Sequence, residues 1–360
     1  MQQPIDKQLL ESRERIAQFD KSKMLGSIEA LADQINQAWQ ETQKINFSPS
    51  AEIKNVVVSG MGGSALGAHV IQSLFQNKLT VPITIVNDYA LPGFVNQTTL
   101  VILSSYSGNT EETLSCAEEA LTKHAQIMVI TSGGKLQEFA EKHNKPIYLI
   151  DPKHNPSDQP RMAIGYSVFG QIGLFAKANL LQITQEEIDQ VITTIIDVTQ
   201  KNNVEVLPDK NQAKLLAYAC LEKKPILVSA EFLAGASHVA TNQFNENAKI
   251  FADYKVVPEL NHHLMEGLRF PTSNSLTDLF LIVNSNLYQQ RNQKRLELTK
   301  QVIQDNQIEI ETIELVSETK LTQVFELITL LSFTNFYLAI LEKIDPSPIP
   351  FVDWFKSQLS

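Results

Sequence analysis

An α/β fold with two parallel sheets is predicted by three features of the sequence. Short runs rich in Val, Ile and Leu alternate with longer stretches whose apolar residues have helical spacing. The strand-like runs are apolar throughout, as expected for a sheet that helices cover on both faces. The same alternation starts again in the second half of the chain. Two related α/β halves are therefore predicted.

Five strands are predicted in the first half, each at an apolar run. They are NVVVSG (55–60), ITIVND (83–88), TLVILSS (99–105), QIMVITS (126–132) and IYLI (147–150). Amphipathic stretches such as residues 112–124 separate them and are predicted to be helices. Ligands of open parallel sheets bind beyond the carboxyl ends of the strands, so the residues that follow these strands are the candidate site.

Four further strands are predicted in the second half, at PILVSA (225–230), AKIFADYK (248–255), LFLIVNS (279–285) and IEIETIELV (308–316). The two halves open alike, because VSGMGGSALGAHV and VSAEFLAGASHV each place Gly-Ala shortly before His-Val. Prolines then break the last helix before a short amphipathic tail. We predict an N-terminal helical segment (1–40), a first domain (41–200), a second domain (205–343) and a C-terminal tail (344–360).

Composition limits the classes of function. The chain has 360 residues, 43% of them hydrophobic, which suffices for a buried core of about two domains. Only 19% are charged and the net charge is −10, so no basic surface is expected for nucleic acid or an anionic membrane. Two cysteines, Cys116 and Cys220, are too few for a disulfide framework. The charged N-terminal stretch and the lack of an eighteen-residue apolar run predict a cytoplasmic protein.

A glycine-rich turn follows the first strand. Backbone N–H groups at such a strand-to-helix turn can bind an anion when glycines let the ligand approach. Gly60, Gly62 and Ala65 fit a permissive dinucleotide pattern, with Asp88 as a late candidate for the ribose contact. The turn alone is equally compatible with a dinucleotide, a phosphate monoester, or close packing without a ligand.

The turn after the third strand favours a phosphate monoester. It brings five small polar side chains to one helix N-terminus: Ser104, Ser105, Ser107, Asn109 and Thr110. Hydroxyl donors in this number can surround the free oxygens of a terminal phosphate. The alternative is a simple helix cap at Ser107 or Thr110. Because both turns are predicted at the same sheet edge, we favour the phosphate site.

Seven segments together resemble one known family. GMGGSALG, SSYSGNTEET, ITSGGKL, PRMAIGYS, FNENAK, PELNHHLMEG and DPSPIPFVDWFK extend from Gly60 to Lys356. They resemble the sugar isomerase (SIS) superfamily, and within it the bifunctional phosphoglucose/phosphomannose isomerases. The resemblance implies two tandem SIS domains with flavodoxin-like sheets, and a homodimer. It also implies interconversion of glucose 6-phosphate, and of mannose 6-phosphate, with fructose 6-phosphate through an enediol.

The resemblance also assigns roles to residues. It places the substrate phosphate on Gly62, Gly63, Ser64, Ser105, Ser107 and Thr110, and the reaction on Glu246, His262, Lys356 and Arg161. Glu246 would carry the proton between C2 and C1, and Arg161 would stabilise the enediolate. His262 would open the sugar ring with the help of Lys356. Without the resemblance, a surface pair with Lys249 would be the simplest interpretation of Glu246. His262 would be a loop histidine at a domain seam, and Arg161 and Lys356 would lie on the surface.

Two expectations concern partners and cofactors. The resemblance implies that His262 enters the active site of the neighbouring subunit. Other members follow this histidine with Asn and Glu, whereas His263 and Leu264 follow it here, so the sugar contacts of this loop are expected to differ. No carboxylate or thiol completes a metal site around His262 and His263 at helical spacing, and neither a metal nor a redox cofactor is expected.

Two other functions remain as alternatives. A non-catalytic sugar-phosphate-binding SIS regulator would usually carry a DNA-binding or effector segment, and no basic helix-turn-helix pattern is present. An aminotransferring isomerase that makes glucosamine 6-phosphate would need an N-terminal cysteine nucleophile, whereas this chain starts MQQPIDKQ.

Overall fold

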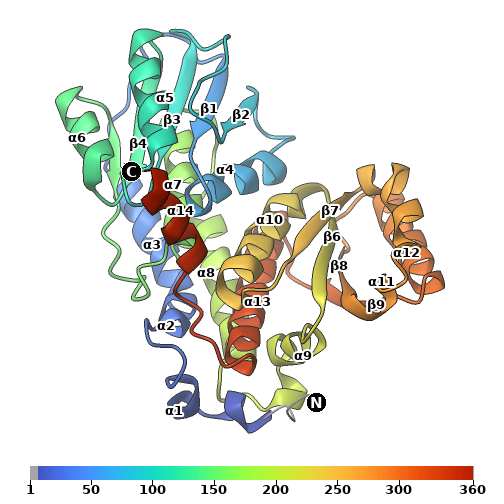
Figure 1. The fold of residues 1–360 in the computed structure, drawn as a ribbon. Helices are drawn as coiled ribbons and strands as arrows, with labels where there is room; N and C mark the ends of the chain where they lie inside the picture. Colours follow the sequence, from blue (N-terminus) through green and yellow to red (C-terminus); the bar gives the residue numbers. More distant parts are fainter. Residues whose placement is uncertain (1–6, 360) are drawn as a thin grey trace.

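The structure is a computed structural model that describes residues 7–359. The first six residues of the predicted N-terminal segment, and Ser360, lie outside this range. Two parallel sheets with helices on their faces form the molecule (Figure 1), which confirms the predicted fold class. The chain enters the first half through η1 (Lys7–Glu11), α1 (Arg13–Ile16), α2 (Met24–Glu29) and α3 (Leu31–Thr42).

The first sheet contains the five predicted strands. They are β1 (Asn55–Ser59), β2 (Ile83–Val86), β3 (Thr99–Ser104), β4 (Gln126–Thr131) and β5 (Ile147–Leu149). The spatial order is β2-β1-β3-β4-β5, with every neighbouring pair parallel. This is the flavodoxin-like order, in which the direction of winding reverses between β1 and β3. The glycine-rich and serine-rich turns therefore lie side by side at the position where such sheets bind ligands.

Helices cover both faces of this sheet, as the apolar strands predicted. On one face, Val57 and Val101 pack with α5 (Glu111–Thr122) and α6 (Gly134–Lys142). On the other, Val56 and Val58 belong to a larger core that includes α4 (Gly63–Leu74) and α7 (Ile164–Lys177). Because successive strand residues point to opposite faces, both sides of β1 are buried.

The second sheet repeats the first with one strand fewer. Its strands are β6 (Lys224–Ala230), β7 (Asp253–Val257), β8 (Asp278–Ser285) and β9 (Glu309–Leu315), all parallel in the order β7-β6-β8-β9. The prediction for residues 248–255 was wrong in its first part, because the strand starts only at Asp253. A π-helical turn, η5 (Phe244–Ala248), occupies the preceding residues and ends at Lys249, which has left-handed backbone angles.

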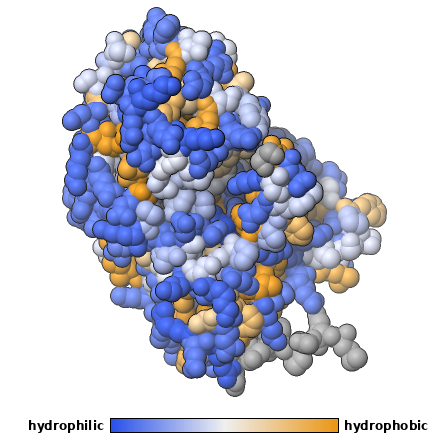
Figure 2. All heavy atoms as spheres, turned by 60° about the vertical axis from the view of Figure 1, so that its left-hand side comes forward, coloured by the Kyte–Doolittle hydropathy of each residue, from blue (hydrophilic) through white to orange (hydrophobic). Residues whose placement is uncertain are grey.

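One long helix forms the centre of the second half. α13 (Lys320–Leu341) contacts α8 (Gln185–Asn202), α9 (Gln212–Ala219) and α10 (Ala234–Gln243). Among the described residues it is the one helix long and apolar enough to cross a membrane, but 94% of that apolar stretch is buried in the protein, as in a core helix. The remaining helices are α11 (Asn274–Thr277), α12 (Gln290–Asp305) and α14 (Pro350–Leu359). The face seen in Figure 2 is mostly hydrophilic, with smaller hydrophobic patches.

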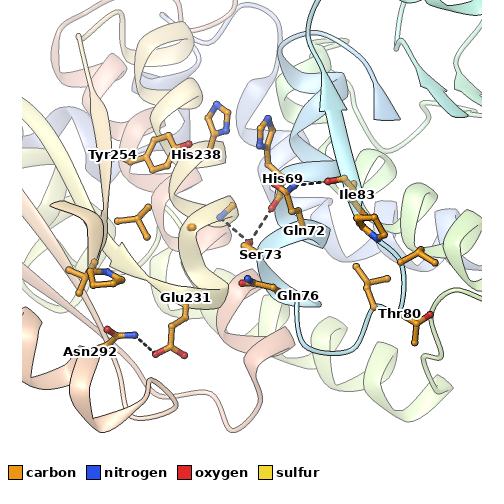
Figure 3. A pocket seen from close by; sticks show the side chains of 18 residues that line it. His69, Gln72, Ser73, Gln76, Thr80, Ile83, Glu231, His238, Tyr254 and Asn292 are labelled. Carbon is orange, nitrogen blue, oxygen red and sulfur yellow. Dashed lines mark hydrogen bonds between the residues drawn. The ribbon is translucent and has the colours of Figure 1, made fainter. Parts of the chain in front are cut away.

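The two halves meet where α4 packs against α10. A side-chain carbon at Gly235 would lie 2.4 Å from the carbonyl oxygen of His69, so a glycine permits this close approach. His69 and His238, the histidines of the two similar opening segments, face each other with ring centroids 4.4 Å apart. They line a pocket of about 810 Å³ between the halves, and Tyr254 stacks on His238 (Figure 3).

This histidine pair predicts a loss of stability in acid. Burial and the neighbouring His238 lower the pKa of His69 to about 4, and burial lowers the pKa of His238. A histidine in the unfolded chain has a pKa of about 6.5. Between these values the unfolded chain binds more protons, so the free energy of unfolding decreases as the pH falls. We expect a decrease of roughly 1–2 kcal/mol from His69 between about pH 7 and about pH 5.

Urea unfolding at both pH values would test this expectation. His69→Asn should lose less stability on acidification than the wild-type protein, because it removes one proton-binding group. His124→Asn alters an exposed histidine and serves as the control. An unchanged pH dependence in His69→Asn would contradict the prediction.

Candidate active site

The two predicted phosphate-binding turns are joined directly by hydrogen bonds. The backbone N–H of Tyr106 donates to Ser64 Oγ at 2.9 Å, and Ser104 Oγ donates to the Ser64 carbonyl at 2.8 Å. The turn after β1 is therefore held against the turn after β3. This arrangement brings Ser64 next to the hydroxyl-rich segment, as the shared sheet edge predicted.

The hydroxyl groups of the second turn do not act as a helix cap. Thr110 is the N-cap residue of α5, but its side chain makes no capping hydrogen bond. Its Oγ1 instead forms a 2.8 Å hydrogen bond with the Oγ of Ser105. The Ser105 side chain is buried. Ser107 is exposed, and its Oγ accepts from the Asn109 N–H at 3.3 Å. The start of α5 is thus left open for an anion, with hydroxyl groups beside it.

Two glycines make the first turn possible. Gly62 has a φ of +49°, a conformation that glycine adopts without steric cost. At Gly63, a side-chain carbon would lie 3.0 Å from the backbone nitrogen of Arg161. The absence of a side chain therefore lets η2 (Pro160–Met162), which carries Arg161, pack directly on this turn.

Arg161 is the most connected side chain of the site, and it is 1% exposed. The alternative of a surface loop arginine is therefore wrong. Nε donates to Asn247 Oδ1 at 2.5 Å, and Nη1 donates to Gln159 Oε1 at 2.8 Å and to Glu246 Oε2 at 3.3 Å. Nη2 donates to the carbonyls of Pro346 at 3.0 Å and Ser347 at 2.8 Å. All five N–H groups are thus engaged, which balances the cost of burying the charge.

Glu246 lies on the π-helical turn η5, directly after α10. Its carboxylate pairs with Arg161 and not with Lys249, whose Nζ donates to the Glu246 main-chain carbonyl. Burial raises the pKa of Glu246, while the charges of Arg161, Lys249 and Lys356 act in the opposite direction. A carboxylate whose pKa is raised by partial burial binds a proton more strongly than an exposed one, which suits a group that takes a proton from carbon.

Lys356 is brought toward this site. It lies on α14, where no side chain is buried, and its charge lowers the pKa of Glu246. Residues 344–349 connect α13 to α14, and we call them the C-terminal strap. Because Arg161 holds the Pro346 and Ser347 carbonyls, it also holds the strap that leads to Lys356.

His262 is not brought to Glu246 of the same chain by any contact among the described residues. It is exposed on η6 (Glu259–His262), and the adjacent Asn261 is fixed to α12 by a 2.8 Å hydrogen bond to Thr299. Figure 1 shows α12 on the far side of the second sheet from α14. His263 approaches Glu259 at 3.9 Å and is also exposed.

Several residues around the site were not identified from the sequence. Asn247 supports Arg161 and donates to Asn335 Oδ1 at 2.8 Å, while Gln159 and the strap carbonyls complete the arginine's partners. Asn247, Pro346 and Ser347 lie within segments that carried the family resemblance, which was the available signal. Their partnership with Arg161 involves positions more than 80 residues apart and has no local pattern.

Comparison with known proteins identifies the family of this chain. A model described as "SIS domain" matches residues 51–157, and one described as "Bacterial phospho-glucose isomerase C-terminal SIS domain" matches residues 209–359. A bifunctional phosphoglucose/phosphomannose isomerase from Caldicellulosiruptor bescii is 35% identical over 94% of this chain and 99% of its own length. The chain belongs to the bifunctional phosphoglucose/phosphomannose isomerase family. Isomerases of the same name from Thermoplasma acidophilum and Aquifex aeolicus are each 30% identical, over 85% and 89% of this chain and 90% and 94% of their own lengths.

Solved structures support the fold of this family member. A hypothetical protein from Thermus thermophilus aligns with a TM-score of 0.72 at 18% identity, covering 93% of this chain and 89% of its own. A glucose-6-phosphate isomerase-like protein from the same organism aligns with a TM-score of 0.60 at 15% identity, covering 97% and 98%. At these identities the likeness concerns the fold. The domain boundaries stay a prediction.

Proposed function

We propose that this protein interconverts glucose 6-phosphate and mannose 6-phosphate with fructose 6-phosphate through an enediol, as the names of its relatives indicate. The observation that carries the proposal is the half-buried Glu246 carboxylate. It pairs with Arg161, whose backbone packs on the glycine of a hydroxyl-lined anion site. A base, a fixed cation and a phosphate anchor are the groups that this isomerisation needs. The reaction moves a proton within one sugar, so it requires neither a metal nor a redox cofactor.

In this proposal the substrate phosphate binds at the start of α5. Ser107 and Thr110 donate hydroxyl hydrogen bonds, together with Ser64 and Ser105, and the glycines Gly62 and Gly63 leave room for the phosphate. This binding anchors the sugar at one end, so its C1 and C2 carbons can extend toward Glu246.

Ring opening precedes proton transfer. His262 exchanges a proton with the anomeric hydroxyl and the ring oxygen, and Lys356 assists it from α14. Because the neighbouring Asn261 is bonded to α12 and His262 lacks a contact with Glu246 in its own chain, we propose that His262 serves the partner subunit of a homodimer. The proposal includes a cytoplasmic location.

Glu246 then removes the C2 proton of the open aldose, and the C2–H electron pair forms the enediolate. The same carboxyl group returns the proton to C1, and the proton of the C2 hydroxyl passes to the C1 oxygen, which completes the ketose. Arg161 is permanently charged and adjacent to Glu246 Oε2. When Glu246 becomes neutral, the negative charge moves to the enediolate oxygen, so the Nη1 group of Arg161 is free to stabilise this oxygen instead.

A coupled assay tests the proposed activity. Glucose 6-phosphate and mannose 6-phosphate are offered in turn, and the formation of fructose 6-phosphate is followed. Turnover of both sugars is expected. Binding of both sugars without any turnover would instead indicate a non-catalytic SIS regulator.

Ser107→Ala is expected to weaken the binding of substrate and of phosphosugar-acid inhibitors by about 1–3 kcal/mol, because one charge-assisted hydrogen bond to phosphate is lost. Since Ser107 is exposed and does not cap α5, the fold should be unaffected. Calorimetric titration with an inhibitor gives the change in affinity. Ser115→Ala, at an exposed serine further along α5, is the control. An unchanged inhibitor affinity in Ser107→Ala would remove this hydroxyl from the site.

A further inference from the structure

Lys249 occupies an unusual position directly beside the base. It follows the π-helical turn that carries Glu246, and its φ of 57° is a left-handed conformation. A residue with a side chain adopts this conformation at a steric cost that glycine avoids. Lys343 has the same backbone conformation, so what distinguishes Lys249 is the set of contacts that its side chain makes.

The contacts of Lys249 connect two parts of the site. Its Nζ donates to the main-chain carbonyl of Glu246 and, at 3.0 Å, to the carbonyl of Pro346 in the C-terminal strap. The Pro346 carbonyl also accepts from Arg161 Nη2 at 3.0 Å. One strap carbonyl thus receives hydrogen bonds from two cationic side chains, one from each half of the molecule.

The hydrogen bonds of Arg161 and Lys249 to the Pro346 carbonyl hold the chain just before α14. α14 has no buried side chain, so its own packing does little to place Lys356. The fixed points nearest to it in the chain are the Pro346 and Ser347 carbonyls, held by Arg161 and Lys249. Loss of one of the two cations would leave the strap, and the helix that follows it, less well placed.

We propose that Lys249 is a positioning residue of the isomerase reaction, which fastens the C-terminal strap to the Glu246 turn and adds a positive charge beside the base. This inference rests on the proposed function. It assigns Lys249 no contact with the substrate.

The charges around Glu246 and Lys249 predict how the dependence of kcat on pH changes when Lys249 is replaced. Arg161, Lys249 and Lys356 face Glu246, and each lowers its pKa against the effect of burial. Arg161, Glu246 and Asp345 face Lys249, whose pKa is lowered to about 8 by burial and by Arg161. Removing the Lys249 charge therefore raises the pKa of Glu246, and the acidic limb of the kcat profile moves to higher pH. In the wild-type protein, Lys249 loses its charge as the pH rises through about 8.

Three variants separate this role from a structural one. Lys249→Met should lower kcat roughly 10-fold, with little change in KM, and shift the acidic limb upward by about half a pH unit. Lys249→Arg keeps the charge and should restore most of kcat and the acidic limb. Lys249→Gly relieves the left-handed backbone, so its Tm should equal or exceed that of the wild type while kcat falls as in Lys249→Met.

Lys343→Met is the matched control, because Lys343 is exposed, has a φ of 58° and precedes the same strap. It should have the kcat and the pH profile of the wild type. A wild-type kcat and acidic limb in Lys249→Met and Lys249→Gly would overturn the proposal for Lys249. If the wild-type protein isomerised neither sugar, the proposed function itself would be contradicted. The experiment therefore distinguishes an error in the proposed function from an error in the role of Lys249.

Discussion

Glu246→Gln is expected to lower kcat by at least about 100-fold while KM changes little, because the substitution removes the proton carrier and leaves the phosphate anchor intact. The amide oxygen of glutamine can still accept the hydrogen bond from Arg161 Nη1, which now spans 3.3 Å to the carboxylate. The buried arginine therefore keeps a full set of partners, and the Tm should stay close to that of the wild type. Steady-state kinetics with glucose 6-phosphate and fructose 6-phosphate measure the effect.

Glu318→Gln is the control for this experiment, because it makes the same chemical change at an exposed glutamate before α13. It should have wild-type kinetics. Near-normal turnover in Glu246→Gln would show that another group carries the proton.

Hybrid dimers of Glu246→Gln and His262→Ala chains are expected to recover about half of the wild-type activity per dimer. Each variant alone should be nearly inactive, because every site lacks one of the two groups. If His262 serves the partner's Glu246, one of the two sites in a hybrid has both residues intact. If the two residues act within one chain, no hybrid site is complete.

The two chains can be co-expressed with different affinity tags, and the hybrid isolated by two successive purifications and verified by its mass. A hybrid of wild-type and doubly substituted chains is the matched control. It contains the same residues, but shared sites would then each lack one group. An inactive Glu246→Gln/His262→Ala hybrid would contradict the shared site. A monomeric wild-type protein with full activity would contradict it as well.

The sequence predicted eight of the strands closely because the signal is local. The run TLVILSS contains four successive aliphatic residues (100–103), and β3 is buried along its whole length from Thr99 to Ser104. The prediction failed at the start of β7, where AKIFADYK combines the end of a π-helical turn with a strand. Nothing in the alternation of apolar residues marks Lys249 as the residue with left-handed backbone angles at which the π-helical turn ends.

The candidate site was predictable to the extent that its parts lie in continuous segments. The hydroxyl groups of Ser105, Ser107 and Thr110 are close in sequence, and parallel strand ends meet at one sheet edge, so a shared anion site followed from the pattern. Family resemblance made Glu246, Arg161, His262 and Lys356 candidates for the site, but it described neither their partners nor their burial.

The sequence by itself determined the α/β class, the repeat of two parallel sheets and the location of the hydroxyl-rich turns, because periodicity and turn chemistry act over a few residues. Only the tertiary structure decided that the Glu246 carboxylate pairs with Arg161, 85 residues away, while the nearby Lys249 bonds to main-chain carbonyls. The physical reason is burial. Once Arg161 is enclosed between the two halves, each of its five N–H groups needs an acceptor, and these acceptors come from segments that only the packed fold brings together.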